Sequence, residues 1–334
     1  MANHDVSDKR WADADHQRAG RLASVPNAAR RVMEQVFPFA RGTDATPLPG
    51  TPIYLPDSAV QNDDQSTILG AIGSLEVRLA TSQRDIHRAQ RLRYSVFYQE
   101  MSAKPSVMHK MLRRDFDRYD AICDHLLVID HDAPADPRTG CPAIVGTYRL
   151  LNQDVAQANG GFYTASEYQI DKLVTARPEL KFLELGRSCV LKPYRTKRTV
   201  ELLWHGIWSY VVQRKIDVLF GCASLDGTDP QALALPLSFL HHFAGADPNW
   251  SVRAVDERHA PMDRIAKDQI NQKHALRSLP PLIKGYLRLG GMIGDGAVVD
   301  HQFGTTDVLI LLPVEKISKR YISYYGEDAS RRAN

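Results

Sequence analysis

Charged residues that could do chemistry lie inside apolar stretches of the sequence. Arg149 lies in GTYRLL, and Glu184 and Arg187 lie in FLELGRSCVL, two stretches that are typical of strands. A charged side chain in such a strand is costly to bury unless it is paired. The partners offered elsewhere in the chain are Arg93 and a loop with Asp115, Asp117 and Asp120. We therefore expect one ionic network, which either lines a functional cleft or only fixes the loop on the sheet.

Spacing indicates which of these side chains lie together. Arg93 and Phe97 are four residues apart in a predicted helix and project from one face. In a regular strand Glu184 faces one side of the sheet, and Arg187 faces the other. Glu184 is the candidate general base.

A basic run follows the second apolar stretch and leads into a helix. It has the sequence KPYRTKRT and contains Lys192, Arg195, Lys197 and Arg198, with no acidic residue. Backbone N–H groups and the dipole at a helix N-terminus favour a phosphate, and the basic side chains add charge-assisted contacts. The alternative is a solvated basic loop.

The elements that position these residues can be predicted from periodicity and capping signals. Strands are expected over residues 75–79, 125–130, 143–151, 182–191, 217–225 and 305–313. Helices are expected over 82–101, 199–213 and 230–243, and a further helix begins near Pro280 and ends at Gly290. Hairpin-connected strands followed by a strand–helix–strand unit predict an α/β (α+β) fold, with a mixed, mostly antiparallel sheet and helices on both faces.

The N-terminal part of the chain differs from the rest. Residues 1–70 are rich in Asp, Ala, Pro and Asn and are predicted to form a largely disordered tail. Residues 25–37 have the pattern of a basic amphipathic helix, which could lie on an anionic inner-membrane surface or dock on the core. The catalytic domain with its C-terminal extension is expected over 71–325, and 326–334 form a short tail.

Composition and residue spacing argue against several classes of protein. The net charge of +3 on 334 residues does not indicate a nucleic-acid binder, and no apolar run is long enough for a membrane span. The four cysteines are widely spaced, which fits a reducing cytoplasm. No metal-ligand spacing is present, so we predict no metal and a cytoplasmic protein, either free or peripheral on the inner membrane.

Together these motifs resemble a known family. The order of strand, basic loop and helix resembles the GNAT acyltransferase fold. The patterns Arg93-x-x-x-Phe97, Asp115-x-Asp117-x-x-Asp120 and Glu184-x-x-Arg187 resemble the autoinducer synthases. The blocks LPPLIKGYLRLG and DHQFGTTD near the C-terminus are more similar to the bacterial L-ornithine N-alpha-acyltransferases of ornithine-lipid synthesis.

The resemblance implies transfer of a 3-hydroxyacyl group from acyl carrier protein to the alpha-amine of L-ornithine, giving lyso-ornithine lipid. The phosphopantetheine thioester would be a co-substrate, with no bound cofactor. Substrate would contact the arginines and aspartates of the ionic network together with Phe97, the aspartates suiting the ammonium groups. The basic run at Lys192, Arg195, Lys197 and Arg198 would contact the carrier. Two alternatives stay open: an acyl-homoserine lactone synthase, and a non-catalytic lipid-surface protein on the same fold.

Overall fold

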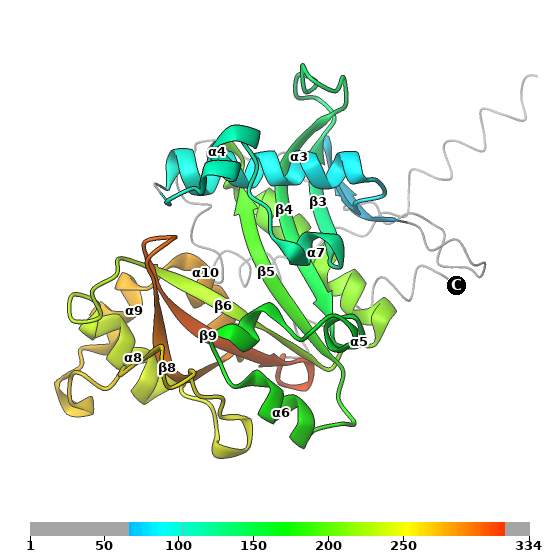
Figure 1. The fold of residues 1–334 in the computed structure, drawn as a ribbon. Helices are drawn as coiled ribbons and strands as arrows, with labels where there is room; N and C mark the ends of the chain where they lie inside the picture. The colour runs from blue at the N-terminus through cyan, green and yellow to red at the C-terminus, as the bar shows by residue number, and fades with distance from the viewer. Residues whose placement is uncertain (1–66, 102, 318–334) are drawn as a thin grey trace, which may run out of the picture.

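The structure is a computed structural model that describes residues 67–101 and 103–317. These residues form one large sheet with helices on both faces (Figure 1). The strand order is β1-β2-β3-β4-β5-β6-β9-β8-β7. The strands are β1 Ile68–Ile72, β2 Leu75–Leu79, β3 Asp124–Asp130, β4 Ala143–Asn152, β5 Phe182–Val190, β6 Val218–Asp226, β7 His259–Ala260, β8 Met292–Asp300 and β9 Thr305–Pro313.

All neighbouring strands are antiparallel except β5 and β6, which run parallel. A parallel pair needs a crossover connection, and helix α7, Lys197–Arg214, provides it. The prediction of a mixed, mostly antiparallel sheet is therefore confirmed. The other α-helices are α3 Gln83–Tyr94, α4 Val107–Leu112, α5 Gln153–Ala158, α6 Ile170–Ala176, α8 Ala234–Ala244, α9 Gln272–Ser278 and α10 Pro281–Arg288.

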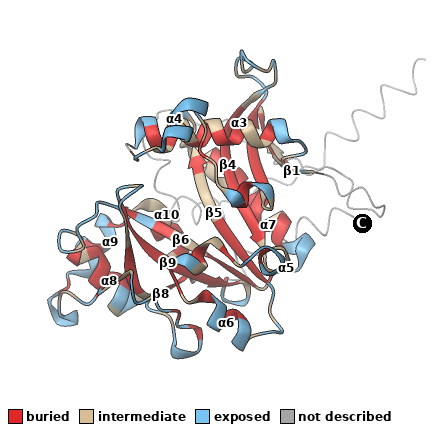
Figure 2. Cartoon of the chain, in the orientation of Figure 1, coloured by how far each residue is buried: buried red, intermediate tan, exposed pale blue. Residues whose placement is uncertain are grey.

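The side chains of β3 show how the layers form. Leu126 and Val128 belong to the apolar cluster that contains α7, whereas Leu127 and Ile129 belong to the cluster that contains α3. Because successive side chains of a strand point to opposite faces, α3 and α7 cover opposite faces of the sheet. Further along, α8, α9 and α10 join the α7 layer, while α5 and α6 pack on the other face. The sheet between them is mostly buried (Figure 2).

Most predicted elements are present. Each predicted strand lies within one residue of its predicted bounds. The predicted helix over 82–101 is α3 followed by a π-helical turn, Ser95–Glu100, and its start is confirmed because Ser82 accepts a hydrogen bond from the Asp85 N–H. The sequence did not predict the strands β1, β7 and β8 or the short helices α4, α5, α6 and α9. In β8, Gly294 and Gly296 weaken the strand pattern.

The predicted domain boundary needs one correction. Residues 68–70, assigned to the tail, form part of β1 and pair with β2 at the edge of the sheet. The short apolar run in this segment was too brief to indicate a strand on its own. Residues 1–66 of the predicted tail, including the amphipathic helix over 25–37, lie outside the described residues, and so do residues 326–334.

An irregularity in β5 changes the direction of a functional side chain. The β4–β5 register shifts between Thr147 and Arg149, and Arg187 has a φ of 51°, in the left-handed region. Such a bulge reorients the residue that it contains. Arg187 therefore reaches Asp117, which Arg149 also contacts. The prediction that Arg187 and Glu184 lie on opposite faces, made for a regular strand, is wrong.

The parallel strands form a fork. β5 and β6 pair only through residues 182–184 and 218–220, and then they separate. Gly221 lies at the point where β5 and β6 separate. A Cβ atom at this position would lie 2.2 Å from the carbonyl oxygen of Leu185, so a residue with a side chain would push the strands apart. Glycine thus lets the backbones approach closely at the base of the fork.

Candidate active site

The predicted ionic network exists as an arginine–aspartate cluster, made of Arg93, Arg149, Arg187, Asp115, Asp117 and Asp120. Arg93, 1% exposed, extends from α3 and contacts Asp115 at 2.8 Å and Asp120 at 2.8 Å. Arg149 contacts Asp117 at 2.6 Å from β4. Arg187 contacts the other oxygen of Asp117 at 3.3 Å. The cluster thus joins α3, the acidic loop and two central strands.

Every carboxylate oxygen of this cluster accepts a hydrogen bond. Asp115 accepts from Arg93 and the Tyr98 hydroxyl. Asp117 accepts from both strand arginines and its own turn. Asp120 accepts from Arg93, Gln90 and the backbone. The three aspartates therefore hold the arginines in place. The predicted contact between these aspartates and the ammonium groups of a substrate stays a prediction.

Electrostatics agree with this pairing. Burial alone would raise the pKa of Asp117, but Arg149 and Arg187 beside it lower that pKa to about 2. Burial would likewise raise the pKa of Asp115, but Arg187 and Arg93 keep it below the ordinary value. Both groups are therefore ionised at neutral pH, and their charges are matched by the guanidinium groups.

We expect the stability that Asp117 contributes to depend on pH. Its folded-state pKa of about 2 is lower than the ordinary 3.8, so the contribution is present above pH 3.8 and is lost as the pH falls through about 2. At 1.36 kcal/mol per unit it amounts to about 2 kcal/mol. Urea unfolding at several pH values should therefore show the advantage of wild type over Asp117→Asn shrinking by about this amount between pH ~5 and pH ~2. A constant difference would contradict the assignment, and exposed Asp171→Asn is the control.

Phe97 lies beside the cluster rather than within it. Its ring packs edge-on against Phe303 at 5.7 Å between centroids, and the Arg187 guanidinium lies 4.7 Å from the Phe303 ring centre. Arg187 also lies 5.4 Å from the centre of the Tyr163 ring. Two aromatic rings thus flank Arg187, and the sequence analysis missed both of them. They come from distant loops, so no local spacing indicates their proximity.

Glu184 is buried, and its carboxylate is fully engaged. One oxygen accepts from the Thr164 N–H at 2.7 Å and from its hydroxyl, and the other accepts from the Tyr163 N–H at 2.9 Å. Burial raises the pKa of Glu184, although these hydrogen bonds and Arg149 partly oppose the rise. The carboxylate therefore anchors the 3-10 turn Tyr163–Ser166 to β5. A base role requires a proton to reach it through this turn.

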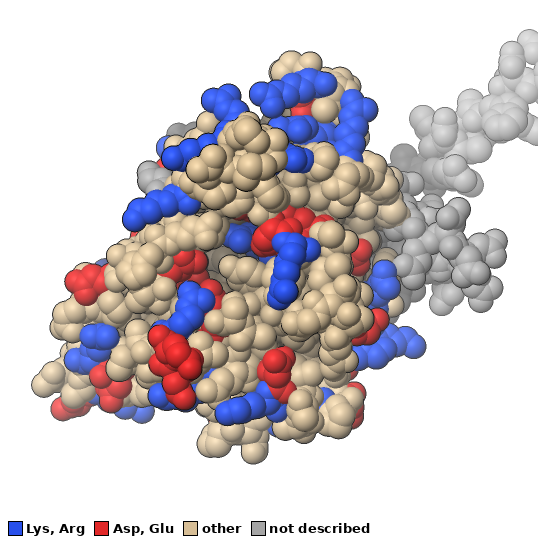
Figure 3. All heavy atoms as spheres, viewed as in Figure 1, with Lys and Arg blue, Asp and Glu red and all other residues tan. Residues whose placement is uncertain are grey.

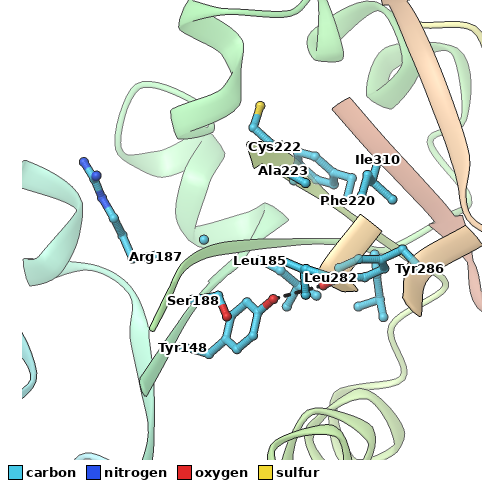
Figure 4. A pocket seen from close by; sticks show the side chains of 13 residues that line it. Tyr148, Leu185, Arg187, Ser188, Phe220, Cys222, Ala223, Leu282, Tyr286 and Ile310 are labelled. Carbon is cyan, nitrogen blue, oxygen red and sulfur yellow. Dashed lines mark hydrogen bonds between the residues drawn. The ribbon is translucent and has the colours of Figure 1, made fainter. Parts of the chain in front are cut away.

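A pocket lies in the fork between β5 and β6 (Figure 4). Residues 185–188 of β5 form one wall and residues 219–223 of β6 form the other, with Leu282 of α10 and Ile310 of β9 behind them. The hydroxyls of Tyr148 and Tyr286 meet at 3.1 Å at one side. The pocket is therefore apolar along most of its wall, with Arg187 at its rim, as suits a chain with one polar end.

The basic run begins directly after β5 and enters α7 as predicted. Thr196 caps the helix by accepting a hydrogen bond from the Thr199 N–H. Arg195 forms a double contact with Glu100, and Lys197 lies 3.7 Å from Glu201. Lys192 is exposed. Two of the four predicted carrier contacts thus have acidic partners within the molecule.

The sequence is similar to one family model and to named proteins of bacteria. Residues 92–205 match the family model described as acetyltransferase (GNAT) domain. A protein of Brucella abortus (strain 2308) named L-ornithine N(alpha)-acyltransferase is 55% identical over 270 residues, which is 81% of this chain and 95% of that protein. A protein of the same name from Rhodobacter capsulatus is 39% identical over 75% of this chain and 95% of its own. The chain belongs to the L-ornithine N(alpha)-acyltransferase family. It is an acyltransferase, and the predicted GNAT-like fold is confirmed.

Solved structures outside the L-ornithine N(alpha)-acyltransferase family align at low identity. FeeM, an N-acyl amino acid synthase, is 10% identical over 72% of this chain and 91% of its own, with a TM-score of 0.38. The AHL synthase LasI is 14% identical, and the alignment covers 76% of this chain and 96% of the LasI chain, with a TM-score of 0.40. TM-scores of this size are too low for a comparison of site residues.

Among the described helices, none combines the length and the apolar character that crossing a membrane requires.

Proposed function

We propose that the protein transfers a 3-hydroxyacyl group from the thioester of acyl carrier protein to the alpha-amine of L-ornithine, giving lyso-ornithine lipid. The fork between β5 and β6 carries this proposal, because beyond residue 184 the inner edge of β5 has no strand partner. An extended phosphopantetheine arm fits such an edge, since backbone groups of a strand pair readily with an added chain. The amino acid is taken from the names of the relatives.

The chemistry is a displacement at the thioester carbonyl. The neutral amine forms the new C–N bond, the C–S bond breaks, and the amine proton leaves while the thiolate gains one. Backbone N–H groups of β5 at the fork would stabilise the oxyanion. Glu184 is the candidate base, reached through the turn at Tyr163 and Thr164. Arg187, flanked by aromatic rings, would bind the carboxylate of the amino acid at the rim of the pocket.

Product analysis tests the proposal. The full chain is incubated with 3-hydroxyacyl carrier protein and L-ornithine, and mass spectrometry is used to look for the N-acyl product while thiol release is followed. The expected result is one amide formed per thiol released. An acyl-homoserine lactone formed only with S-adenosylmethionine would favour the autoinducer alternative. No product with either acceptor would favour a non-catalytic lipid-surface protein.

The carrier interface gives a separate prediction. Lys192→Ala combined with Arg198→Ala leaves the pairs Arg195–Glu100 and Lys197–Glu201 intact. Opposite charges speed association and are screened by salt, because the Debye length falls from about 10 Å at 0.1 M to about 3 Å at 1 M. We expect this double variant to raise the KM for acyl carrier protein severalfold and to flatten its salt dependence, leaving the KM for ornithine unchanged.

The control for the carrier prediction is Lys273→Ala with Arg277→Ala, which removes two exposed basic residues of α9. This pair should leave both KM values as in wild type. Equal changes in the KM values for carrier and ornithine in the Lys192/Arg198 variant would place the basic run at the amino-acid site and contradict the carrier assignment.

A further inference from the structure

A second group of acids lies beside the fork, and it differs from the arginine–aspartate cluster. Glu167 follows the turn Tyr163–Ser166, Asp300 ends β8, and Asp307 lies in β9. One oxygen from each lies within 4.8 Å of the others. Glu167 is 3% exposed and Asp307 is 8% exposed, while Asp300 is half-buried. We call these three residues the carboxylate triad.

The triad has fewer cationic donors than the arginine–aspartate cluster, although Asp300 accepts hydrogen bonds from the backbone N–H groups of Gln302 and Phe303. Oε2 of Glu167 and Oδ1 of Asp307 are buried, and neither has a hydrogen-bond partner. Uncharged donors lie beside these acids: the hydroxyls of Ser224 and Thr305 oppose the rise in the pKa of Asp307, and the thiol of Cys222 does so for Glu167. Among the described residues, the ion pair that reaches the triad comes from Arg258, 3.3 Å from the other oxygen of Glu167. Buried carboxylate oxygens without donors are costly, so the arrangement favours an added cation with several N–H groups.

The electrostatics support this reading. Burial raises the pKa of Glu167, and the neighbouring Asp307 raises it further. Burial also raises the pKa of Asp307; the hydroxyls of Ser224 and Thr305 partly oppose the rise, and the charge of Asp300 adds to it. In the arginine–aspartate cluster, by contrast, guanidinium groups lower the pKa of Asp115 and Asp117. Guanidinium groups thus balance the negative charge of the arginine–aspartate cluster, whereas the negative charge of the carboxylate triad is only partly balanced.

The triad borders the proposed acyl site. Cys222 lines the pocket, and its thiol turns away from Tyr148 and Tyr286 (Figure 4). That thiol contacts Glu167 and lies 3.9 Å from the hydroxyl of Thr164, which donates to Glu184. On the other side, burial raises the pKa of the Tyr163 hydroxyl; the charge of Arg187 lowers this pKa, and the charge of Glu167 raises it. Cys222 therefore contacts both the pocket of the fork and the triad.

We propose that Glu167, Asp300 and Asp307 bind the side-chain ammonium group of the amino-acid acceptor. This inference rests on the proposed function and names the group that selects ornithine. Charge-assisted N–H···O distances of about 2.8 Å place oxygens around an ammonium nitrogen about 4.6 Å apart, and the three triad oxygens all lie within 4.8 Å of one another. The carboxylate of the acceptor would lie toward Arg187, and its alpha-amine would lie between the two ends, at the mouth of the fork.

The test compares L-ornithine with L-norvaline, which has the same carbon chain but no side-chain amine. We expect Asp307→Asn and Asp300→Asn each to lower kcat/KM for ornithine by about 10–100-fold, the effect of losing a hydrogen bond to a charged group. With norvaline, kcat/KM should stay the same or rise. Asp295→Asn removes a surface carboxylate of β8 that pairs with Arg253 and should change neither value. Parallel losses for both acceptors would overturn the inference.

Binding measurements separate this inference from the proposed function. Thermal unfolding first shows which variants fold; Asp300→Asn, at a half-buried site, serves if Asp307→Asn does not. Ornithine should raise the Tm of wild type more than norvaline does, and the triad variants should lose this difference. If wild type binds ornithine in this way but does not acylate it, the proposed function fails and the triad assignment stands. If Mg²⁺ or Ca²⁺ instead raises the Tm, and only in the presence of the intact triad, the site is a metal site and the inference is overturned.

An independent observation concerns helix α4. None of its residues is buried, although it contains Val107, Met108, Met111 and Leu112, with exposures of 81%, 48%, 65% and 36%. Met101, 49% exposed, precedes it. The segment 101–114 also contains four basic residues and no acidic residue; the basic residues are Lys104, Lys110, Arg113 and Arg114. Figure 3 shows Lys and Arg side chains gathered over the end of the molecule where α3 and α4 lie.

We infer that this apolar and basic surface, the α4 patch, docks on an anionic lipid bilayer. Apolar side chains at the tip of a short helix can enter the headgroup region, while the surrounding cations meet anionic lipid. A membrane also suits an enzyme whose proposed product carries an acyl chain. The charge sign and the mixture of long apolar and basic side chains therefore match this partner.

Vesicle sedimentation of the full chain tests the α4 patch. Binding to phosphatidylglycerol-containing vesicles should exceed binding to pure phosphatidylcholine vesicles, and Val107→Asp with Met111→Asp should reduce it at least tenfold. Val212→Asp, at an exposed apolar residue of α7, is the matched control and should bind as wild type does. Unchanged binding of the double variant would overturn the inference, because the contact would then lie elsewhere. A change confined to the KM for acyl carrier protein would overturn it too, and assign the patch to the carrier.

Discussion

Replacing Arg93 with methionine is expected to lower the free energy of unfolding by about 3–5 kcal/mol, the cost of removing one partner from a buried ion pair. Arg93 is almost completely buried, and its guanidinium contacts both Asp115 and Asp120. Methionine fills a similar volume but removes the charged donor from each of the two carboxylates. Because typical domains are stable by only about 5–15 kcal/mol, this loss is a large part of the total.

Urea unfolding of wild type and the Arg93→Met variant measures the effect. Arg138→Met is the control, because Arg138 is exposed in the loop between β3 and β4, and its stability should match wild type within about 0.5 kcal/mol. An Arg93→Met protein with wild-type stability would mean that the buried aspartates find other donors. The arginine–aspartate cluster would then not hold α3 to the acidic loop.

Glu184→Gln is expected to lower turnover by about 10²–10⁴-fold, the usual contribution of a general acid–base group. The structure adds a complication. The carboxylate accepts from two backbone N–H groups at the turn Tyr163–Ser166, and an amide NH₂ cannot accept from one of them. Part of any loss could therefore come from a displaced turn, so turnover alone does not identify the base.

The pH profile separates the two causes. Burial raises the pKa of Glu184 above its ordinary 4.5, and a base must be ionised. Wild-type kcat/KM should therefore fall as the pH decreases through a pKa above 4.5, and the residual activity of Glu184→Gln should lack this limb. Thr164→Val removes one hydroxyl contact and keeps the carboxylate, so its acid limb should persist. A folded Gln variant with near-normal turnover would leave proton removal to solvent.

The sequence predicted the arginine–aspartate pairing because the cost of burying Arg149 and Arg187 is a local property of their strands. It did not predict the direction of Arg187, because the bulge results from the pairing of β5 with β4 rather than from its own residues. The carboxylate triad was missed for a related reason. Asp300 and Asp307 flank one hairpin turn, but Glu167 comes from a distant segment. Only tertiary packing brings that segment to the hairpin, where the Tyr168 hydroxyl donates to the carbonyls of Gly296 and Asp307.

The strand pattern was easier to predict than the helical details. Apolar runs such as the one in β3 indicate a strand whatever its neighbours are. The helix α4 has no buried face, so the packing periodicity that normally predicts a helix is absent there. The assignment of substrate ammonium groups to Asp115, Asp117 and Asp120 stays a prediction that rests on their charge alone. A sequence reveals which charges are present but not which oxygens already have donors.

The fork has a consequence for solubility. A strand edge with unpaired N–H and C=O groups is a template for aggregation, and proteins usually protect it with charges, proline or a short length. The inner edge of β5 is unpaired beyond residue 184, yet it faces β6 across a gap whose base is fixed by the Gly221 contact. A strand of another chain with a neighbouring sheet attached cannot enter that gap, whereas a single extended arm can. The unpaired edge of β5 is therefore accessible to a single extended ligand but not to the sheet of a second copy of the protein.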